Sequence, residues 1–388
     1  MAENANKPSI RFKGYTDAWG QRKLGEIGDF KNGMNFDKDA MGLGYPFVNL
    51  QDIFGKTIVN NDGLGLAEST EKQRKEYSLK KGDVLFIRSS VKPEGVGEAA
   101  LVANDFPDTT YSGFIIRFRP SVTLNDQYKR FVFTTKSIRN QIMIKATSSA
   151  NTNINQDSLG LVVLGIPKEE EQEKIGSFFH TLDDTITLHQ RKLNGLRELK
   201  QGYLQQMFPQ AGECVPRNRF AGFSGVWQER KLERVVNVNS GRDYKHLNSG
   251  EIPVYGTGGY MLSVDESLSE VDAIGIGRKG TIDKPQLLFA PFWTVDTLFF
   301  LTALQNNDLL FLYALSQCIK WAKMDESTGV PSLSKVNIEK VVVSVPEETE
   351  QIAIGRFFRN LDEQIAMQTH KLEQLKQLKT AYLQHMFV

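Results

Sequence analysis

Two stretches of the chain share a pattern of apolar and polar positions that is typical of a long helix. In residues 166–208 apolar residues recur in steps of four and three from Ile175 onward, and residues 345–387 repeat these steps from Ile354. Such heptad spacing predicts one long helix per stretch, with an apolar seam that packs against another helix. An amphipathic helix on an ordinary core is the alternative, but the length and repetition of the pattern favour paired helices.

Polar residues interrupt both seams at the same two places. They are His189 and Lys200 in the first stretch, and Gln368 and Lys379 in the second. A polar residue in a helix seam lowers stability but fixes the register of the pair. We therefore expect these four residues to set the helix register or the docking of a partner.

The two helical stretches belong to an internal duplication. Aligned at an offset of 179 residues, they are identical at 21 of 43 positions without a gap. A shared motif, R-F-x-G-[YF] with a later Trp and [RK]-K-L, lies far upstream of each, at residues 11–24 and 219–232. Its offset is 208, so the second copy is 29 residues shorter between motif and helix. The chain therefore has the plan domain, helix, domain, helix.

The segments between motif and helix predict mixed domains of helices and strands. Each contains short runs rich in β-branched and aromatic residues, punctuated by glycine, and then a helical pattern. The predicted strands are 82–88, 113–119, 271–276 and 295–301, and the predicted helices are 125–145 and 306–324. We thus expect two α/β (α+β) domains, at 1–165 and 209–344, and long helices within 166–208 and 345–388.

Composition limits the function without naming it. The 388 residues suffice for two or three domains, and the net charge of +1 permits nucleic-acid binding without predicting it. No apolar run approaches the ~18 residues of a membrane span, and the polar first residues do not resemble a secretory signal. Two cysteines are too few for a disulfide framework, which favours a reducing cytoplasm.

Catalytic motifs are weak or missing in the sequence. Residues 275–280 match G-x-G-x-x-G, yet Pro285 follows and forbids the helix that a dinucleotide site needs. A tight turn that presents Arg278 and Lys279 is the favoured interpretation. The five histidines and two cysteines show no metal-ligand spacing. The chain is therefore predicted to hold no metal or cofactor and not to be an enzyme itself.

Polar and basic residues gather on the predicted turns of both domains. Arginine suits guanine edges, asparagine suits adenine, and lysine suits phosphate, so these residues are candidates for DNA binding. Solvated turns and helix faces are the alternative for any one of them, but their recurrence in two divergent domains favours recognition surfaces. The candidates are Asn32, Asn35, Arg88, Ser89, Ser90, Lys92, Lys129, Arg130, Asn151, Asn153, Arg242, Tyr244, Lys245, Tyr255, Thr257, Arg278, Lys279, Ser332 and Lys335.

The order of these motifs resembles that of the specificity subunit of type I restriction–modification enzymes. The resemblance rests on the duplicated R-F-x-G-[YF] frame and on the two helix starts, E-E-E-Q-E-K-I-G-S-F-F and E-T-E-Q-I-A-I-G-R-F-F. It also rests on the two helix ends, Y-L-Q-Q-M-F and Y-L-Q-H-M-F. The resemblance covers nearly the whole chain.

This resemblance implies a non-catalytic, cytoplasmic, DNA-binding subunit. Its two domains would be target-recognition domains, each reading one half of a split DNA sequence in the major groove. The long helices would pack antiparallel as a coiled coil, set the unread spacer, and dock two modification (methyltransferase) subunits. Motor–nuclease subunits would join the full complex. S-adenosylmethionine, ATP and Mg²⁺ would be bound by those partners, and adenine N6 methylation is the usual modification.

The seam residues are the predicted contacts of the helices. We expect the subunit interface to include Phe179, Leu182, Ile186, Leu193, Leu196, Tyr203, Phe358, Leu361, Ile365, Leu372, Leu375 and Tyr382. A helix of 38 residues spans about 57 Å, so heads at its two ends would lie about one DNA turn apart. Two other classes stay open: a coiled-coil scaffold with two protein-binding heads, and a nucleotide-dependent enzyme built on residues 275–280.

Overall fold

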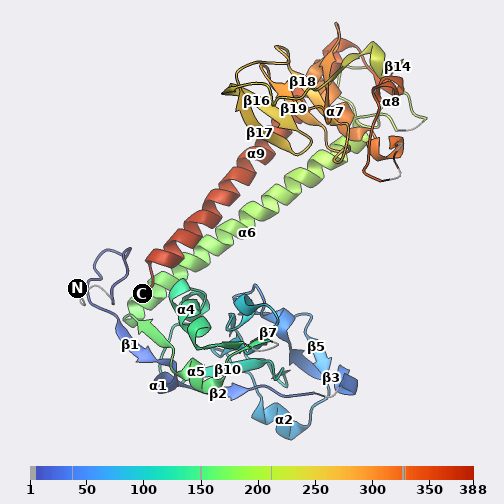
Figure 1. The fold of residues 1–388 in the computed structure, drawn as a ribbon. Coiled ribbons are helices and arrows are strands. Elements are labelled where there is room, and N and C mark those ends of the chain that lie inside the picture. Colours follow the sequence, from blue (N-terminus) through green and yellow to red (C-terminus); the bar gives the residue numbers. More distant parts are fainter. Residues whose placement is uncertain (1–5, 37, 149–150, 211, 326, 328) are drawn as a thin grey trace. The chain divides into compact units, whose positions relative to one another are not determined.

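The computed structural model describes residues 6–36, 38–148, 151–210, 212–325, 327 and 329–388. The chain forms two compact units, which we describe one at a time. The first unit consists of Met1–Leu188 and Leu372–Val388, and the second of His189–Lys371. Each unit therefore contains one α/β domain and parts of both long helices (Figure 1).

A five-stranded sheet forms the centre of the first unit. Its strand order is β2-β10-β6-β8-β4, antiparallel except for the parallel pair of β4 and β8. The strands are β2 (Gly28–Asn32), β10 (Ile115–Pro120), β6 (Val84–Ile87), β8 (Ala99–Val102) and β4 (Ile58–Val59). Strands β6 and β8 are buried at every residue, because one apolar cluster covers each face of the sheet. That burial explains their continuous apolar runs.

Two three-stranded sheets and several helices add to the first domain. Strands β5 (Gly65–Ala67), β3 (Met41–Val48) and β9 (Thr110–Tyr111) form one sheet, and β11 (Thr147–Ser148), β12 (Thr152–Asn153) and β7 (Ser89–Ser90) form the other. After the short α1 (Leu24–Ile27), its helices are α2 (Glu71–Glu76), α3 (Asp126–Val132), α4 (Lys136–Lys145) and α5 (Gln156–Gly160). The expected single helix over 125–145 is wrong, because the chain breaks at Phe133 and restarts where Thr135 caps α4. The break turns the Phe133 ring onto Phe86 in the sheet.

The second unit repeats this plan with fewer strands. Its main sheet has the order β15-β21-β18-β19, and β17-β16-β20 forms a second sheet. These strands are β15 (Val236–Ser240), β21 (Leu298–Ala303), β18 (Ala273–Gly277), β19 (Gln286–Leu288), β17 (Gly259–Val264), β16 (Ser249–Gly256) and β20 (Trp293–Thr294). Helix α7 (Leu309–Cys318) packs on the main sheet, and α8 (Lys335–Lys340) follows. The helix predicted over 306–324 is therefore too long, because it ends at Cys318 and Trp321–Met324 form a 3-10 turn. Two α/β domains with long helices confirm the predicted fold class.

The duplicated motif ties each domain to the start of its long helix. A short antiparallel strand pair joins β1 (Gly20–Lys23) to β13 (Val163–Ile166), and another joins β14 (Gln228–Lys231) to β22 (Val342–Val345). Beside them, Arg11 forms two hydrogen bonds, 2.6 and 2.8 Å long, to the buried carboxylate of Glu171. Arg219 does the same to Glu350, with two bonds of 2.6 Å. These hydrogen bonds raise the pKa of both guanidinium groups.

The two long helices have the predicted length and pair antiparallel within each unit. They are α6 (Glu169–Gln206) and α9 (Glu348–His385), 38 residues each, light green and red in Figure 1. In the first unit, Phe178 of α6 stacks edge-on against Tyr382, and Asp183 pairs with Lys379 at 2.5 Å. These contacts run from early in α6 to late in α9, which makes the pair antiparallel.

The second unit repeats both contacts with the helices exchanged. Tyr203 of α6 stacks on Phe357 of α9 with the same edge-on geometry, and Lys200 pairs with Asp362 at 2.5 Å. The offset of 179 residues maps each contact of one unit onto its counterpart in the other. The lysines that interrupt the seams therefore act as ion-pair partners that fix the register of the helices.

The other polar break is a hydrogen-bonded pair in the second unit. Gln368 donates from Nε2 to the backbone oxygen of His189 at 3.0 Å and also contacts His189 Nδ1. The duplication aligns His189 with Gln368, so the two partners of this contact occupy equivalent positions in the two helices. Gln368 is buried. Its amide can therefore contact His189 only when the two helices pair in this register.

The last residues of the chain complete the core of the first unit. Met386 and Phe387 are buried, and the Phe387 ring packs against Trp19 and Tyr128. Ile10 donates a backbone hydrogen bond to the oxygen of His385 at 2.9 Å. None of the helices in the described parts of the chain is long and apolar enough to cross a membrane.

Candidate nucleic-acid interface

Four loops meet at one end of the strands of the main sheet in the first unit. The central one begins at Arg88, directly after β6, and its backbone N–H donates to the oxygen of Phe114 at 2.7 Å. The Arg88 guanidinium also reaches the oxygen of Gly113, at 3.3 Å. On its other side, Ile154 donates to the oxygen of Arg88 at 2.9 Å. The Arg88 backbone thus joins the loop before β10 to the loop before α5.

The second unit has the same hydrogen bonds around Arg278. This residue follows β18, and its backbone N–H donates to the oxygen of Thr297 at 2.8 Å. Its guanidinium reaches the oxygen of Asp296 at 3.5 Å, and Leu333 donates to the oxygen of Arg278 at 2.9 Å. Arg88 and Arg278 are therefore structural counterparts, as their sequence positions predicted.

The remaining loop of each unit follows the first strand of the main sheet. Met34 donates to the oxygen of Tyr111 at 2.8 Å, and Arg242 donates to the oxygen of Thr294 at 2.9 Å. We call the four loops together the loop face of a unit. It comprises residues 32–36, 88–92, 112–114 and 151–154 in the first unit, and residues 240–245, 278–280, 295–297 and 331–333 in the second.

Glycine is required where these loops cross. A Cβ atom built on Gly33 would clash with the backbone oxygens of Tyr111 and Ser112. One built on Gly241 would clash with the oxygens of Thr294 and Val295. The same close approach of two backbones explains why both copies of the duplication have a glycine here.

Most of the predicted DNA-binding residues lie on the two loop faces. The first loop face contains Asn32, Asn35, Arg88, Ser89, Ser90, Lys92, Asn151 and Asn153, and the second contains Arg242, Tyr244, Lys245, Arg278, Lys279 and Ser332. Tyr255 and Thr257 lie beside the second, where Val295 donates to the oxygen of Tyr255. Residues 149, 150 and 328 of the predicted polar loops lie outside the described residues.

Three predicted residues lie away from the loop faces or at their edge. Lys129 is buried and donates to the oxygen of Gly82 at 2.7 Å. Arg130 pairs with Asp183 of α6 at 2.8 Å; burial lowers the pKa of its guanidinium, and the charge of Asp183 opposes that shift. Lys335 opens α8 just beyond the second loop face and lies 3.6 Å from Glu339. The first two residues hold the first unit together and are not available to a ligand in this structure.

The seam residues pack inside the chain. The rings of Phe179 and Phe358 stack on Phe387 and Phe208 in the two apolar cores, and the seam leucines other than Leu196 are buried. Ile186, Leu196 and Ile365 are half-buried. A face for partner subunits would therefore have to use mainly other positions of the same helices.

Sequence reasoning missed the apolar side chains of the first loop face. Val91 and Phe114 are exposed in the midst of the predicted polar residues, and Phe54 is exposed beside them. The sequence did contain a signal for them, because a valine and a phenylalanine stand in turns flanked by serine, lysine and glycine. In the second unit the corresponding loops add Asp243 and Asp296, two exposed carboxylates that the prediction also left out.

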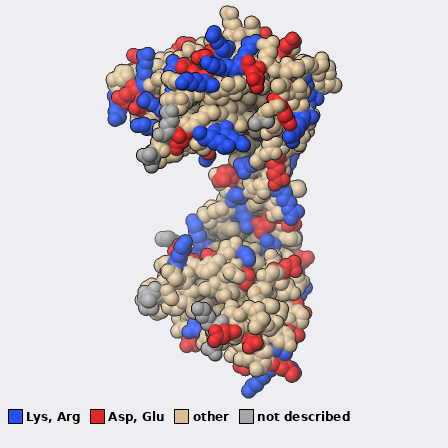
Figure 2. Space-filling view, turned by 90° about the vertical axis from the view of Figure 1, so that its right-hand side faces the viewer, with Lys and Arg blue, Asp and Glu red and all other residues tan. Residues whose placement is uncertain are grey.

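The charged side chains of the second unit are of both signs. Figure 2 shows Lys and Arg interspersed with Asp and Glu over its viewed face, in the upper part of the picture. This mixture agrees with the near-neutral net charge. Within the described residues, no group of three His, Cys, Asp or Glu side chains could hold a metal ion.

Comparison with known proteins gives matches over much of the chain. The family described as "Type I restriction modification DNA specificity domain" matches residues 16–198 and 225–377. The putative type I restriction enzyme MjaX specificity subunit of Methanocaldococcus jannaschii is 24% identical over 197 residues, which cover 49% of this chain and 45% of that protein. The HindI specificity subunit of Haemophilus influenzae is 26% identical over 201 residues, covering 49% and 40%. The matches thus span less than half the length of these curated relatives.

A solved structure has the same fold over nearly the full length. The type I restriction–modification S subunit from M. genitalium superimposes with a TM-score of 0.67 and 19% identity, and the match covers 98% of this chain and 99% of that chain. The family match occurs twice, once in each half of the duplication, and together the two matches cover well over half of the chain. This chain belongs to the family of type I restriction–modification DNA specificity domains.

Proposed function

We propose that this chain is the non-catalytic DNA-specificity subunit of a type I restriction–modification complex. Each loop face reads one half of a bipartite DNA sequence through the major groove. The observation that carries this proposal is a constant backbone with variable side chains: Arg88 and Arg278 share all three hydrogen bonds, whereas Gly113 and Phe114 correspond to Asp296 and Thr297. Such an arrangement suits two different base sequences read in one geometry.

An exchange of one domain tests this function. Replacing residues 37–150 by the corresponding segment of another specificity subunit is expected to change one half of the methylated sequence and leave the other half unchanged. Sequencing methylated adenines in cells that express the hybrid with the modification subunit gives the result. No split sequence, or one that the exchange does not alter, would contradict the proposal.

Single arginine substitutions give a finer prediction. We expect Arg88→Ala to relax the half-site of the first unit, and Arg278→Ala that of the second, by about 1–3 kcal/mol each if the guanidinium groups bind guanine. Binding of the assembled complex to oligonucleotides with single base changes measures this loss. Arg22→Ala is the matched control, since this exposed arginine pairs with Glu26 in the frame, away from the loop face. An equal loss on every sequence would mean phosphate contact instead.

We also propose that exposed apolar positions of the two long helices, in each unit, dock the modification subunits. Large apolar side chains are exposed there at matching positions of the duplication: Leu188 and Met367, with 66% and 65% of their surface accessible, and also Leu199 and Leu378. Two equivalent apolar faces suit two copies of one partner. The partners, which supply S-adenosylmethionine, would methylate adenine N6; motor subunits, when present, would add ATP, Mg²⁺ and cleavage.

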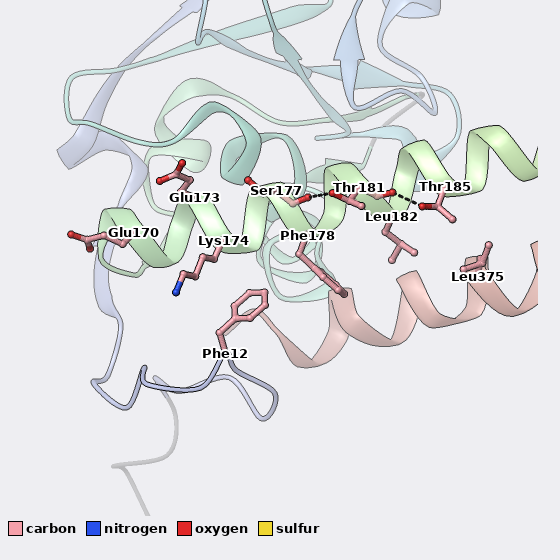
Figure 3. Close-up of a pocket in the computed structure, with 10 residues that line it drawn as sticks. All are labelled: Phe12, Glu170, Glu173, Lys174, Ser177, Phe178, Thr181, Leu182, Thr185 and Leu375. Carbon is pink, nitrogen blue, oxygen red and sulfur yellow. Dashed lines mark hydrogen bonds between the residues drawn. The ribbon is translucent and has the colours of Figure 1, made fainter.

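A separate groove in the first unit is a second candidate surface for a partner. It has a volume of about 750 Å³, and Phe12, Phe178, Leu182 and Leu375 form its apolar lining (Figure 3). The hydroxyls of Thr181 and Thr185 on its α6 side are turned to helix backbone oxygens, as the dashed lines show. These threonines therefore offer methyl groups as well, and the groove suits an apolar side chain of the partner.

Charge introduced on this surface is expected to block docking. Leu188→Glu should weaken the binding of one partner copy and Met367→Glu that of the other, each roughly 10- to 100-fold, because a buried leucine contributes about 1.5–3 kcal/mol. Size-exclusion chromatography with light scattering counts the bound copies. The control is Arg197→Glu, a charge change at an exposed polar position of α6. Full occupancy of both sites in the double variant would show that docking lies elsewhere.

A further inference from the structure

A hollow opens on the loop face of the first unit, with a volume of about 510 Å³. Its apolar walls come from Leu50, Phe54, Val91 and Phe114, and Val91 and Phe114 are 81% and 56% exposed. Of the described residues that line it, Lys92 is the one charged group. Apolar side chains are thus presented to solvent in the middle of a surface that is otherwise made of serine, asparagine and basic residues.

The backbone around this hollow is fixed, so its apolar walls have defined positions. A Cβ atom built on Gly95 would lie 2.6 Å from the ring of Phe54 and 2.7 Å from Ser90 Oγ, so the Phe54 ring needs a glycine beneath it. Ser90 Oγ in turn accepts a hydrogen bond from the backbone N–H of Lys92 at 3.1 Å. Phe114 donates its own N–H to Ser112 Oγ at 3.3 Å. The loops therefore present their apolar groups from a hydrogen-bonded base.

The second unit has different chemistry in the equivalent loops. Thr297 takes the place of Phe114, and Asp296 that of Gly113, at the backbone hydrogen bonds of Arg278. The depression there is lined by polar groups that include Asp243 and Lys245. The region around Phe114 in the first loop face is therefore apolar and the equivalent region around Thr297 in the second is polar, while the backbone hydrogen bonds of the two are the same.

We propose that the hollow of the first unit receives the 5-methyl group of a thymine in the major groove. This assignment rests on the proposed function and names one base contact of the half-site that the first unit reads. Among the base edges of the major groove, the thymine methyl is the apolar feature, and apolar side chains recognise it. The charge agrees, because Lys92 lines the hollow and Arg88 begins the same loop, which suits the phosphates and guanines around such a base.

Deoxyuridine provides the test, since it lacks only the methyl group and pairs as thymine does. The complex assembled with its modification subunits is titrated with duplexes in which each thymine of its recognition sequence, on either strand, is replaced singly by deoxyuridine. We expect about a 4-fold loss of affinity at one position of the half-site read by the first unit, the equivalent of ~0.8 kcal/mol for one buried methyl group. In Phe114→Ala and Phe54→Ala complexes this loss should shrink toward 1-fold.

The control is Phe289→Ala, another exposed phenylalanine, which lies outside the loop face of the second unit. It should leave the deoxyuridine pattern unchanged.

Equal affinity for all substituted duplexes, or a first half-site without thymine, overturns the assignment. So does a Phe114→Ala complex that keeps the deoxyuridine loss but binds fewer modification subunits, which would make the hollow a protein-docking site. A complex without any split sequence preference on unmodified DNA would instead refute the proposed function itself.

Discussion

Replacing Glu171 by alanine is expected to lower the melting temperature of the first unit by roughly 6–20 °C. The carboxylate is buried, accepts two hydrogen bonds from Arg11, and accepts a third from the indole of Trp19 at 3.2 Å. Its removal leaves a largely buried guanidinium without its counter-charge, which costs about 3–5 kcal/mol. For units of this size each 1 kcal/mol shifts the melting temperature by about 2–4 °C. Calorimetry of the purified chain measures the shift.

The second unit contains a matched control for this substitution. Glu350 binds Arg219 in the same way, but the indole N–H of Trp227 has no hydrogen-bond partner among the described residues. Glu350→Ala should therefore destabilise its own unit by about 1 kcal/mol less, the usual net contribution of one hydrogen bond. Equal shifts for the two variants would show that the Trp19 bond contributes nothing, and a loss below 1 kcal/mol for both would refute the ion-pair argument.

Lengthening both long helices by one heptad is expected to widen the unread spacer of the DNA target by roughly 3 base pairs. Seven residues add about 10 Å of helix, and the DNA bases are stacked at about 3.4 Å. The insertions have to face each other, because Asp183–Lys379 and Lys200–Asp362 fix the register on either side of the middle. Positions after Leu196 and after Gln364 meet this condition and leave the His189–Gln368 pair intact.

The control for this experiment is the same heptad inserted in only one helix. It shifts one register by seven residues, separates the partners of one lysine ion pair, and should abolish assembly or activity. Methylated-adenine sequencing of the doubly extended variant reads the new spacer. An active double variant with the original spacer would refute the idea that the helices act as a ruler.

The long helices and the polar positions that interrupt their seams could be predicted because the information is local and repeated. Heptad spacing specifies the seam, and the duplication marks His189, Lys200, Gln368 and Lys379 as meaningful interruptions. Which partner each lysine would find was not predictable, since Asp183 and Asp362 look like ordinary surface residues in the sequence. The ion pairs follow from the antiparallel packing, which brings together residues 196 positions apart in the first unit and 162 in the second.

The candidate interface was predicted in part for the same reason. Arg88 and Arg278 stand directly after a buried strand in each copy, and a position at a strand end is readable from sequence. Lys129 and Arg130 were misleading, because a charge run on a helix does not reveal that Gly82 and Asp183 lie against it. Phe54 and Phe114 were missed because an exposed phenylalanine and a core phenylalanine look alike until the fold is known.

The core position of Phe387 has a consequence for synthesis on the ribosome. The first unit needs residues 372–388 to fill its core, whereas the second unit consists entirely of residues 189–371. Domains usually fold in the order in which they are made, but here the half that is translated first is completed last. Until residues 372–388 have been synthesised, Trp19 and Tyr128 lack the ring that covers them, so the core of the first unit stays incomplete while the second unit can already fold.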